Sequence, residues 1–179
     1  MQMNESSENP KPEVWMRGPV QGIPALLQPV AHTLLQVNEE IYEMMQYFPD
    51  ELLWEQPAGV ASVAFHLQHI PGVLDRLFTY AQGKELSHTQ LKYLSEEGLE
   101  DLSIKVDKLV ENLDNQIYKS IEYLKTIDPS ILTQARTVGR KKLPSTVIGL
   151  LFHAAEHTMR HTGQLLVTSR ILSGDEEED

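Results

Sequence analysis

The chain has 179 residues and a mass of 20.3 kDa, which suits one domain with a substantial hydrophobic core. Hydrophobic residues make up 41% of the sequence and charged residues 23%, which excludes a mainly disordered or collagen-like chain. No stretch approaches the roughly 18 consecutive apolar residues of a membrane-spanning helix, and Glu5, Glu8 and Pro10 stand where a signal peptide would be apolar. We therefore expect no membrane association and a cytoplasmic location.

The sequence contains no cysteine, which excludes disulfides, thiolate metal sites and cysteine nucleophiles. A metal ion in this chain must use histidine, carboxylate or water. The formal net charge is -11, and the last five residues, 175–179, carry five negative charges. Because nucleic-acid affinity depends on a positive surface, we expect no nucleic-acid partner. The one basic cluster is short and has the composition of a loop: Arg136, Arg140, Lys141 and Lys142.

Four helical patterns and no convincing strand alternation lie between a polar N-terminal arm, residues 1–12, and an acidic C-terminal tail, residues 174–179. The first helix is predicted over about residues 24–47 and the second over about 62–82. Gly83 is expected to cap the second helix, and Pro71 is expected to kink it immediately after His69. Apolar residues recur in both at spacings of three or four.

A short segment, residues 88–97, is expected to lead into a third helix over about residues 99–127, with Leu102 as the first residue of its apolar stripe. Residues 130–143 are predicted to form a loop. The triplet Pro144-Ser145-Thr146 is a helix-start signal, and the fourth helix is predicted to end at Ser173-Gly174. Residues 13–173 are thus predicted to form one all-α domain, a four-helix bundle with short extra helices in its connections.

Five of the seven histidines fall in two helical patterns: His66 and His69, then His153, His157 and His161. Histidines four residues apart on a helix can bind one ion, but three successive ones cannot, because eight residues of helix rise about 12 Å. The ligand pair on the fourth helix is therefore either His153 with His157 or His157 with His161. A third ligand would come from the second helix, where His69 fits the apolar stripe better than His66.

The segments Ser62-Val63-Ala64-Phe65-His66-Leu67-Gln68-His69, Leu74-Asp75-Arg76-Leu77 and Ala155-Glu156-His157-Thr158-Met159-Arg160-His161-Thr162-Gly163-Gln164 resemble the DinB/YfiT-like superfamily of four-helix-bundle metalloproteins. This superfamily is distinct from the DNA polymerase that shares the DinB name. The resemblance covers about residues 24–172. It implies an up-down-down-up bundle and a divalent metal, nickel or zinc, bound by His69, His157 and His161.

The resemblance also implies a thiol S-transferase or a hydrolase-like enzyme, in which the metal activates a water molecule or a low-molecular-weight thiol of the substrate. The alternative is a non-catalytic module, for binding or stress response, that the metal stabilises. Further polar residues are candidates for supporting the site: His66, His153 and Gln164. A homodimer is possible under either hypothesis.

Two other features have simpler interpretations. The adjacent carboxylates Glu39-Glu40 and Glu96-Glu97 are expected to belong to solvated faces, and Glu156 is expected to pair with Arg160 on an exposed helix surface. The apolar segment from Trp15 to Pro19 lies in a polar arm. It is expected to pack against the bundle, with shaping of the pocket or self-association as alternatives.

Overall fold

The structure is a computed structural model that describes residues 11–174. The predicted arm up to residue 10 and the tail from residue 175 lie outside the described residues. Helices form most of the described chain, and one β-hairpin precedes the last of them. The elements are α1 (Gln28–Met45), α2 (Val63–Ala81), α3 (His88–Glu96), α4 (Val106–Lys125), β1 (Ala135–Val138), β2 (Leu143–Thr146) and α5 (Val147–Ser173).

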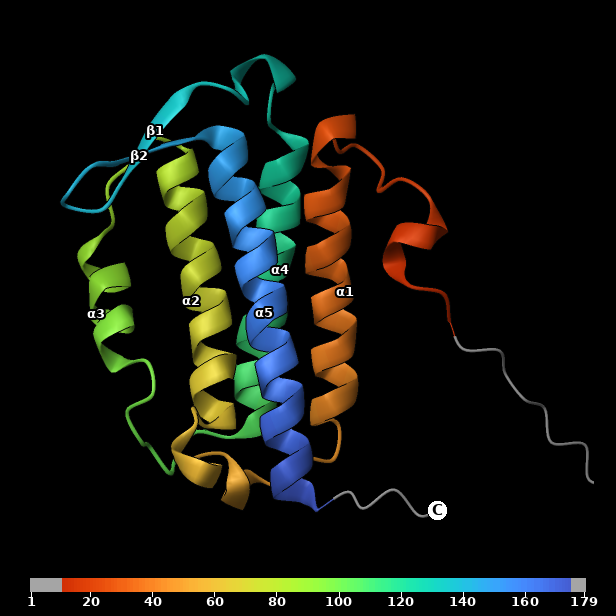
Figure 1. The fold of residues 1–179 in the computed structure, drawn as a ribbon, viewed down its shortest axis with the longest axis vertical. Helices are drawn as coiled ribbons and strands as arrows, with labels where there is room; N and C mark the ends of the chain where they lie inside the picture. Colours follow the sequence, from red (N-terminus) through yellow and green to blue (C-terminus); the bar gives the residue numbers. More distant parts are fainter. Residues whose placement is uncertain (1–10, 175–179) are drawn as a thin grey trace, which may run out of the picture.

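The four long helices form an up-down-down-up bundle, as Figure 1 shows. In that view α1 and α5 run downward, whereas α2 and α4 run upward. Helix α2 packs against α5 and α4, and α1 packs against the same two helices. The interfaces α2–α5 and α1–α4 therefore lie on opposite sides of the bundle. The predicted all-α four-helix bundle is confirmed.

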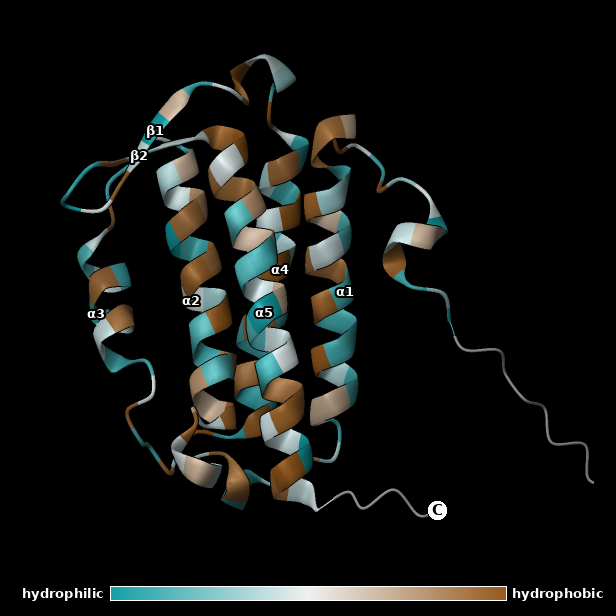
Figure 2. Ribbon diagram, viewed as in Figure 1, coloured by the Kyte–Doolittle hydropathy of each residue, from teal (hydrophilic) through white to brown (hydrophobic). Residues whose placement is uncertain are grey.

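The core consists of the apolar stripes of these helices, and hydrophobic and hydrophilic residues alternate along α1 and α2 in Figure 2. The stripe predicted for the second helix is entirely buried: Val63, Leu67, Ile70, Leu74, Leu77 and Phe78. Burial of such side chains contributes about 1.5–3 kcal/mol each, which makes this stripe the main reason that α2 is held in the bundle.

The ends of the helices follow local hydrogen-bonding chemistry. The Ser62 side chain caps α2 by accepting from the Phe65 amide, and Thr146 caps α5 by accepting from Gly149. Gly174 ends α5 in the left-handed conformation that glycine favours. Helix α2 continues through Pro71 to Ala81. The two helices that carry the clustered histidines, α2 and α5, thus begin and end close to the positions predicted from the sequence.

The predicted start of the third helix is wrong by about seven residues, because α4 begins at Val106. Leu102 does not join the stripe and remains 75% exposed. Asp101 accepts hydrogen bonds from both the backbone amide and the hydroxyl of Ser103, a turn that competes with helix formation. Asp50 accepts from the Val106 amide and so satisfies a donor at the helix start.

The prediction of a loop over residues 130–143 is also wrong in part, since β1 and β2 form an antiparallel hairpin in which Ala135 pairs with Thr146. Strands of four residues are too short for their alternation to be recognised in the sequence. The hairpin is fixed to the bundle by Arg136, which donates to the Ala81 carbonyl at the end of α2.

The Trp15–Pro19 segment lies beside α1 rather than over the site (Figure 1). Val14 is buried there, while Trp15 is 62% exposed. Arg17 anchors the segment through both carboxylate oxygens of Glu39, at 2.7 and 2.8 Å. The solvated face predicted for Glu39 is therefore a partly shielded ion pair.

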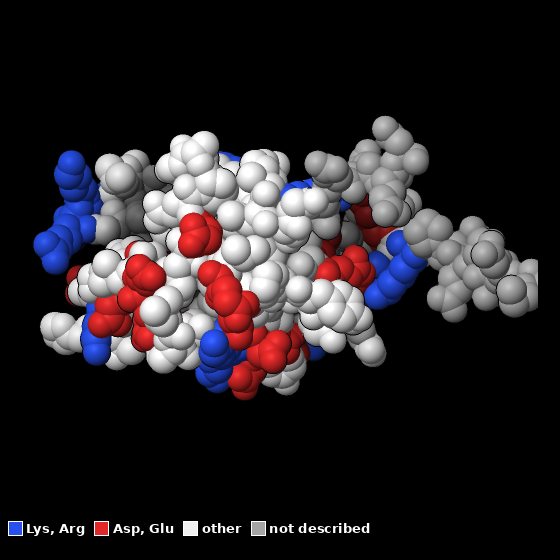
Figure 3. Space-filling model, turned by 90° about the horizontal axis from the view of Figure 1, so that it is seen from below, with Lys and Arg blue, Asp and Glu red and all other residues white. Residues whose placement is uncertain are grey.

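The lower end of the bundle carries acidic side chains at several places, as Figure 3 shows. No continuous basic surface is visible on that face. Among residues 11–174, no helix is both long enough and apolar enough to cross a membrane.

Candidate metal centre

The α2–α5 interface brings together two pairs of histidines. The two pairs lie about 90 positions apart in the sequence. His66 and His69 lie on α2, and His157 and His161 lie one turn apart on α5. His66 is buried, and the other three are partly exposed. The site therefore lies at the edge of the core, where side chains are ordered but solvent still has access.

His69, His157 and His161 form a group that can hold a metal ion. One nitrogen from each ring lies within 4.8 Å of the others. The Nε2 atoms of His69 and His157 are 3.0 Å apart, and the ring centroids of His157 and His161 are 4.6 Å apart. Both pairs that spacing leaves open on the fourth helix occur in such groups. His157 with His161 joins His69, whereas His153 with His157 joins Glu156, in a group whose His153 is exposed.

A carboxylate fixes the orientation of His69. Nδ1 of His69 donates to Oε2 of Glu97 at 2.8 Å, which leaves Nε2 as the nitrogen that faces His157. Arg76 donates to the other oxygen of Glu97. The Glu97 side chain is only 4% exposed, so its predicted place on a solvated face is wrong, although Glu96 beside it is solvated as expected.

His66 supports His161 from the core side. Their Nδ1 atoms are 3.0 Å apart, so one carries the hydrogen and the other accepts it, and Nε2 of His161 is left outside this contact. Burial is the largest cause that lowers the pKa of both His66 and His161 to about 4. Both rings are therefore neutral at pH 7, which is the form that binds a metal.

Burial also lowers the pKa of His157. Its Nδ1 atom is buried and has no hydrogen-bond partner among residues 11–174. Phe65 stacks on His69 with its ring centroid 5.1 Å away and the ring planes at 12°. This aromatic ring covers one side of His69 and excludes water from it.

Two candidate supporting residues lie farther out. His153 is 49% exposed and contacts Glu156, which also accepts from Arg160 as predicted. Gln164 is exposed, and its side chain makes no hydrogen bond within the described part of the chain. Of the supporting residues predicted from the sequence, His66 alone contacts a histidine of the group through a hydrogen bond, while the ring of His153 packs 5.3 Å from that of His157.

The donor set fits a divalent ion. Two imidazole nitrogens that bind one zinc ion at about 2.0–2.1 Å each cannot be more than about 4.2 Å apart, and the 3.0 Å between the Nε2 atoms of His69 and His157 is within that limit. The carboxylate behind His69 is the usual outer partner of a ligating histidine. Zinc and nickel both accept imidazole ligands.

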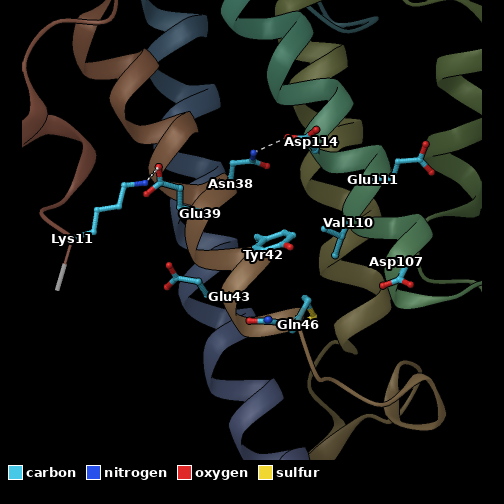
Figure 4. Close-up of a pocket in the computed structure, with 11 residues that line it drawn as sticks. Lys11, Asn38, Glu39, Tyr42, Glu43, Gln46, Asp107, Val110, Glu111 and Asp114 are labelled. Carbon is cyan, nitrogen blue, oxygen red and sulfur yellow. Dashed lines mark hydrogen bonds and ion pairs between the residues drawn. The ribbon is translucent and has the colours of Figure 1, made fainter. Parts of the chain in front are cut away.

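Another groove lies between α1 and α4, on the opposite side of the bundle, and Figure 4 shows its lining. Its volume is about 630 Å³. Its walls carry Glu39, Glu43, Asp107, Glu111 and Asp114, and Asn38 donates to Asp114 at 2.8 Å. No histidine lines it, and the metal-binding group lies across the bundle.

Sequence reasoning missed Glu97 and Arg76, although α2 carries a signal for them. Residues 69, 72 and 76 share one helix face, and the middle position is Gly72. A Cβ atom at Gly72 would clash with Oε1 of Glu97. A glycine between a histidine and an arginine on one face indicates that another group approaches that face closely.

The comparisons with known proteins cover the part of the chain that holds this site. The family model of the DinB superfamily matches residues 29–165, which include all three histidines of the group. A conserved protein from Enterococcus faecalis, known from a crystal structure, matches with a TM-score of 0.65 and 18% identity over 83% of this chain and 98% of its own. At that identity the likeness shows a shared fold. No curated protein matches.

Proposed function

The chain belongs to the DinB superfamily, and from this premise we propose that it is a divalent-metal-dependent enzyme that activates a small thiol or a water molecule. The observation that carries the proposal is the convergence of His69, His157 and His161, whose ring nitrogens lie within 4.8 Å of one another. These three residues would hold the ion. Nickel and zinc are the metals proposed.

The proposed reaction is attack of the sulfur of a low-molecular-weight thiol on an electrophilic substrate, in which the thiol loses its proton as the new bond to sulfur forms. Hydrolysis, with water as the nucleophile, is the related possibility. A bound divalent ion supplies Lewis acidity, which lowers the pKa of a coordinated thiol or water. The chain has no cysteine, so a reacting sulfur would belong to the substrate. Burial lowers the pKa of His157 and of His161, which favours the neutral form that binds a metal. Neutral imidazole ligands leave the full charge of the ion to attract an anion.

The surrounding residues prepare the group for this role. Glu97 holds the Nδ1 hydrogen of His69 and directs Nε2 toward His157. Phe65 shields one face of His69 from water. A site that excludes water in this way strengthens the electrostatic interactions within it.

The test is metal content by plasma mass spectrometry on protein without a histidine tag, after exposure to zinc, nickel and manganese in turn. We expect about one ion per chain in the wild type and none in His157→Ala. His157 also belongs to a second group that could hold an ion, together with His153 and Glu156. His153→Ala distinguishes the two groups, because it removes a ligand of the second group alone and should keep the ion. A wild type without metal, or His157→Ala with a full ion, would contradict the proposal.

A thiol-transfer assay with small thiols and electrophiles separates the enzyme from its alternative. Metal-dependent turnover that is lost in His157→Ala would support the enzyme. A large metal-dependent rise in Tm without turnover would favour a non-catalytic module in which the ion links α2 to α5.

A further inference from the structure

The α3 segment, residues 88–98, lies outside the four-helix bundle and packs on α2 (Figure 1). None of the residues of α3 is buried, and Leu91 and Leu94 are 39% and 43% exposed. The segment therefore contributes little apolar burial. Its attachment to the bundle must come from polar contacts, and segments attached in this way open more easily than a core helix.

Several of these contacts involve polar groups of α2 other than the histidines. Gln90 donates to the Asp75 carboxylate at 2.8 Å. Tyr93 donates its hydroxyl hydrogen to the Gln68 carbonyl at 2.9 Å, and the Gly98 amide donates to the Gln68 side chain at 2.8 Å. These bonds set the position of the segment along α2.

Glu97 makes the salt bridge between the segment and α2. Its buried carboxylate binds Arg76 with one oxygen and His69 with the other. Two glycines make this possible: Gly72 leaves space for the carboxylate, and Gly98 turns the chain with a φ of +82° directly after it. Beside Glu97 lies a hollow of about 770 Å³ between Gln68 and the connection to α4.

We propose that Glu97 is a positioning residue that couples docking of the α3 segment to metal binding at His69. When the segment is docked, the carboxylate fixes the Nδ1–H form of His69 and makes its Nε2 a better donor to the ion. When an ion withdraws electron density from the ring, Nδ1–H becomes a stronger donor to Glu97. Coupling of this kind is reciprocal, so docking tightens metal binding and metal binding tightens docking. This inference rests on the proposed function.

The first measurement is the zinc affinity of Glu97→Gln, by competition with a chromophoric chelator. Loss of an outer carboxylate typically weakens metal binding about 10–100-fold, and we expect a loss in this range with one ion still bound at saturation. Glu96→Gln is the matched control, since that neighbouring carboxylate is 54% exposed and contacts Lys92, and it should stay within about twofold of the wild type. An affinity of Glu97→Gln within twofold of the wild type would overturn the proposal.

The second measurement is hydrogen exchange of residues 88–98 with and without zinc. In the wild type, saturating zinc should slow exchange in this segment, and in saturated Glu97→Gln that effect should vanish. An equal zinc effect in both proteins would overturn the coupling. A merely structural role for Glu97 would change the stability but not the response to zinc.

Two outcomes call for a further variant or measurement. If Glu97→Gln does not fold because Arg76 is left buried without its partner, the double variant Glu97→Gln/Arg76→Met removes both charges and takes its place. If the wild type binds no metal, the proposed function fails. The metal-free exchange experiment then decides the docking role, because Glu97→Gln should exchange faster in residues 88–98 than the wild type, and equal rates would overturn it.

Discussion

The imidazoles of His66 and His161 meet across the α2–α5 interface with their Nδ1 atoms 3.0 Å apart. Two neutral rings satisfy this contact with a single hydrogen, whereas protonation adds charge to a site where burial already disfavours it. The pair is therefore a structural element of the interface and lies beside the candidate metal centre. Its effect on stability can be measured without any metal.

We predict that metal-free protein loses stability between pH 7 and pH 5. The pKa of His66 and that of His161 are about 4 in the folded protein and about 6.5 in the unfolded chain. The unfolded chain therefore binds more protons in this pH range. The free energy of unfolding is then at its full value above about pH 6.5 and falls as the pH approaches 4. Calorimetry should show a drop in Tm of at least about 4 °C.

The His66→Gln variant tests the source of that drop, because glutamine does not titrate. Its Tm should fall by about half as much over the same pH range. His88→Gln, which replaces an exposed histidine on α3, should show the wild-type drop. A drop in His66→Gln as large as that of the wild type would assign the pH dependence to other groups.

A second prediction concerns Arg17 and Glu39, which attach the N-terminal segment to α1. The hydrogen-bonded Arg17 guanidinium is the main cause that lowers the Glu39 pKa to about 2, and Lys11 contributes less. Arg17→Met should raise this pKa toward 4.5, and Lys11→Met should raise it by a smaller amount, as carboxyl NMR titration would show. Because the pair is partly exposed, the loss of stability should not exceed about 1 kcal/mol. A larger rise in Lys11→Met would reverse the assignment.

The sequence predicts what depends on helical spacing and misses what depends on the path of the connections. The stripe of α2 and the histidines on α5 follow from side chains three and four residues apart sharing a face. Glu97 could not be found in this way, since its burial depends on the turn at Gly98 and on a contact 28 residues away in sequence. Leu102 continued an apolar spacing, but the turn at Asp101 delays the start of the helix until Val106.

The third prediction concerns Gly72. Because this residue has no side chain, the Glu97 carboxylate can lie against α2 at this position. A methyl carbon there would clash with Oε1 of Glu97 and lie 2.8 Å from a ring carbon of Tyr93. Gly72→Ala should therefore displace the α3 segment and cost about 1–3 kcal/mol of unfolding free energy, the usual range for overpacking. Urea denaturation would measure this cost, and zinc affinity should fall along with it.

Gly163→Ala is the matched control, since this glycine is also inside a helix but has nothing within 4 Å of the added carbon. Alanine is the better helix former, so this variant should gain up to about 1 kcal/mol while leaving zinc affinity unchanged. The two substitutions add the same atom to two helices and differ in what that atom meets. If Gly72→Ala were as stable as Gly163→Ala, the carboxylate would not occupy the space that this glycine leaves, and the path from α3 to His69 would have to be different.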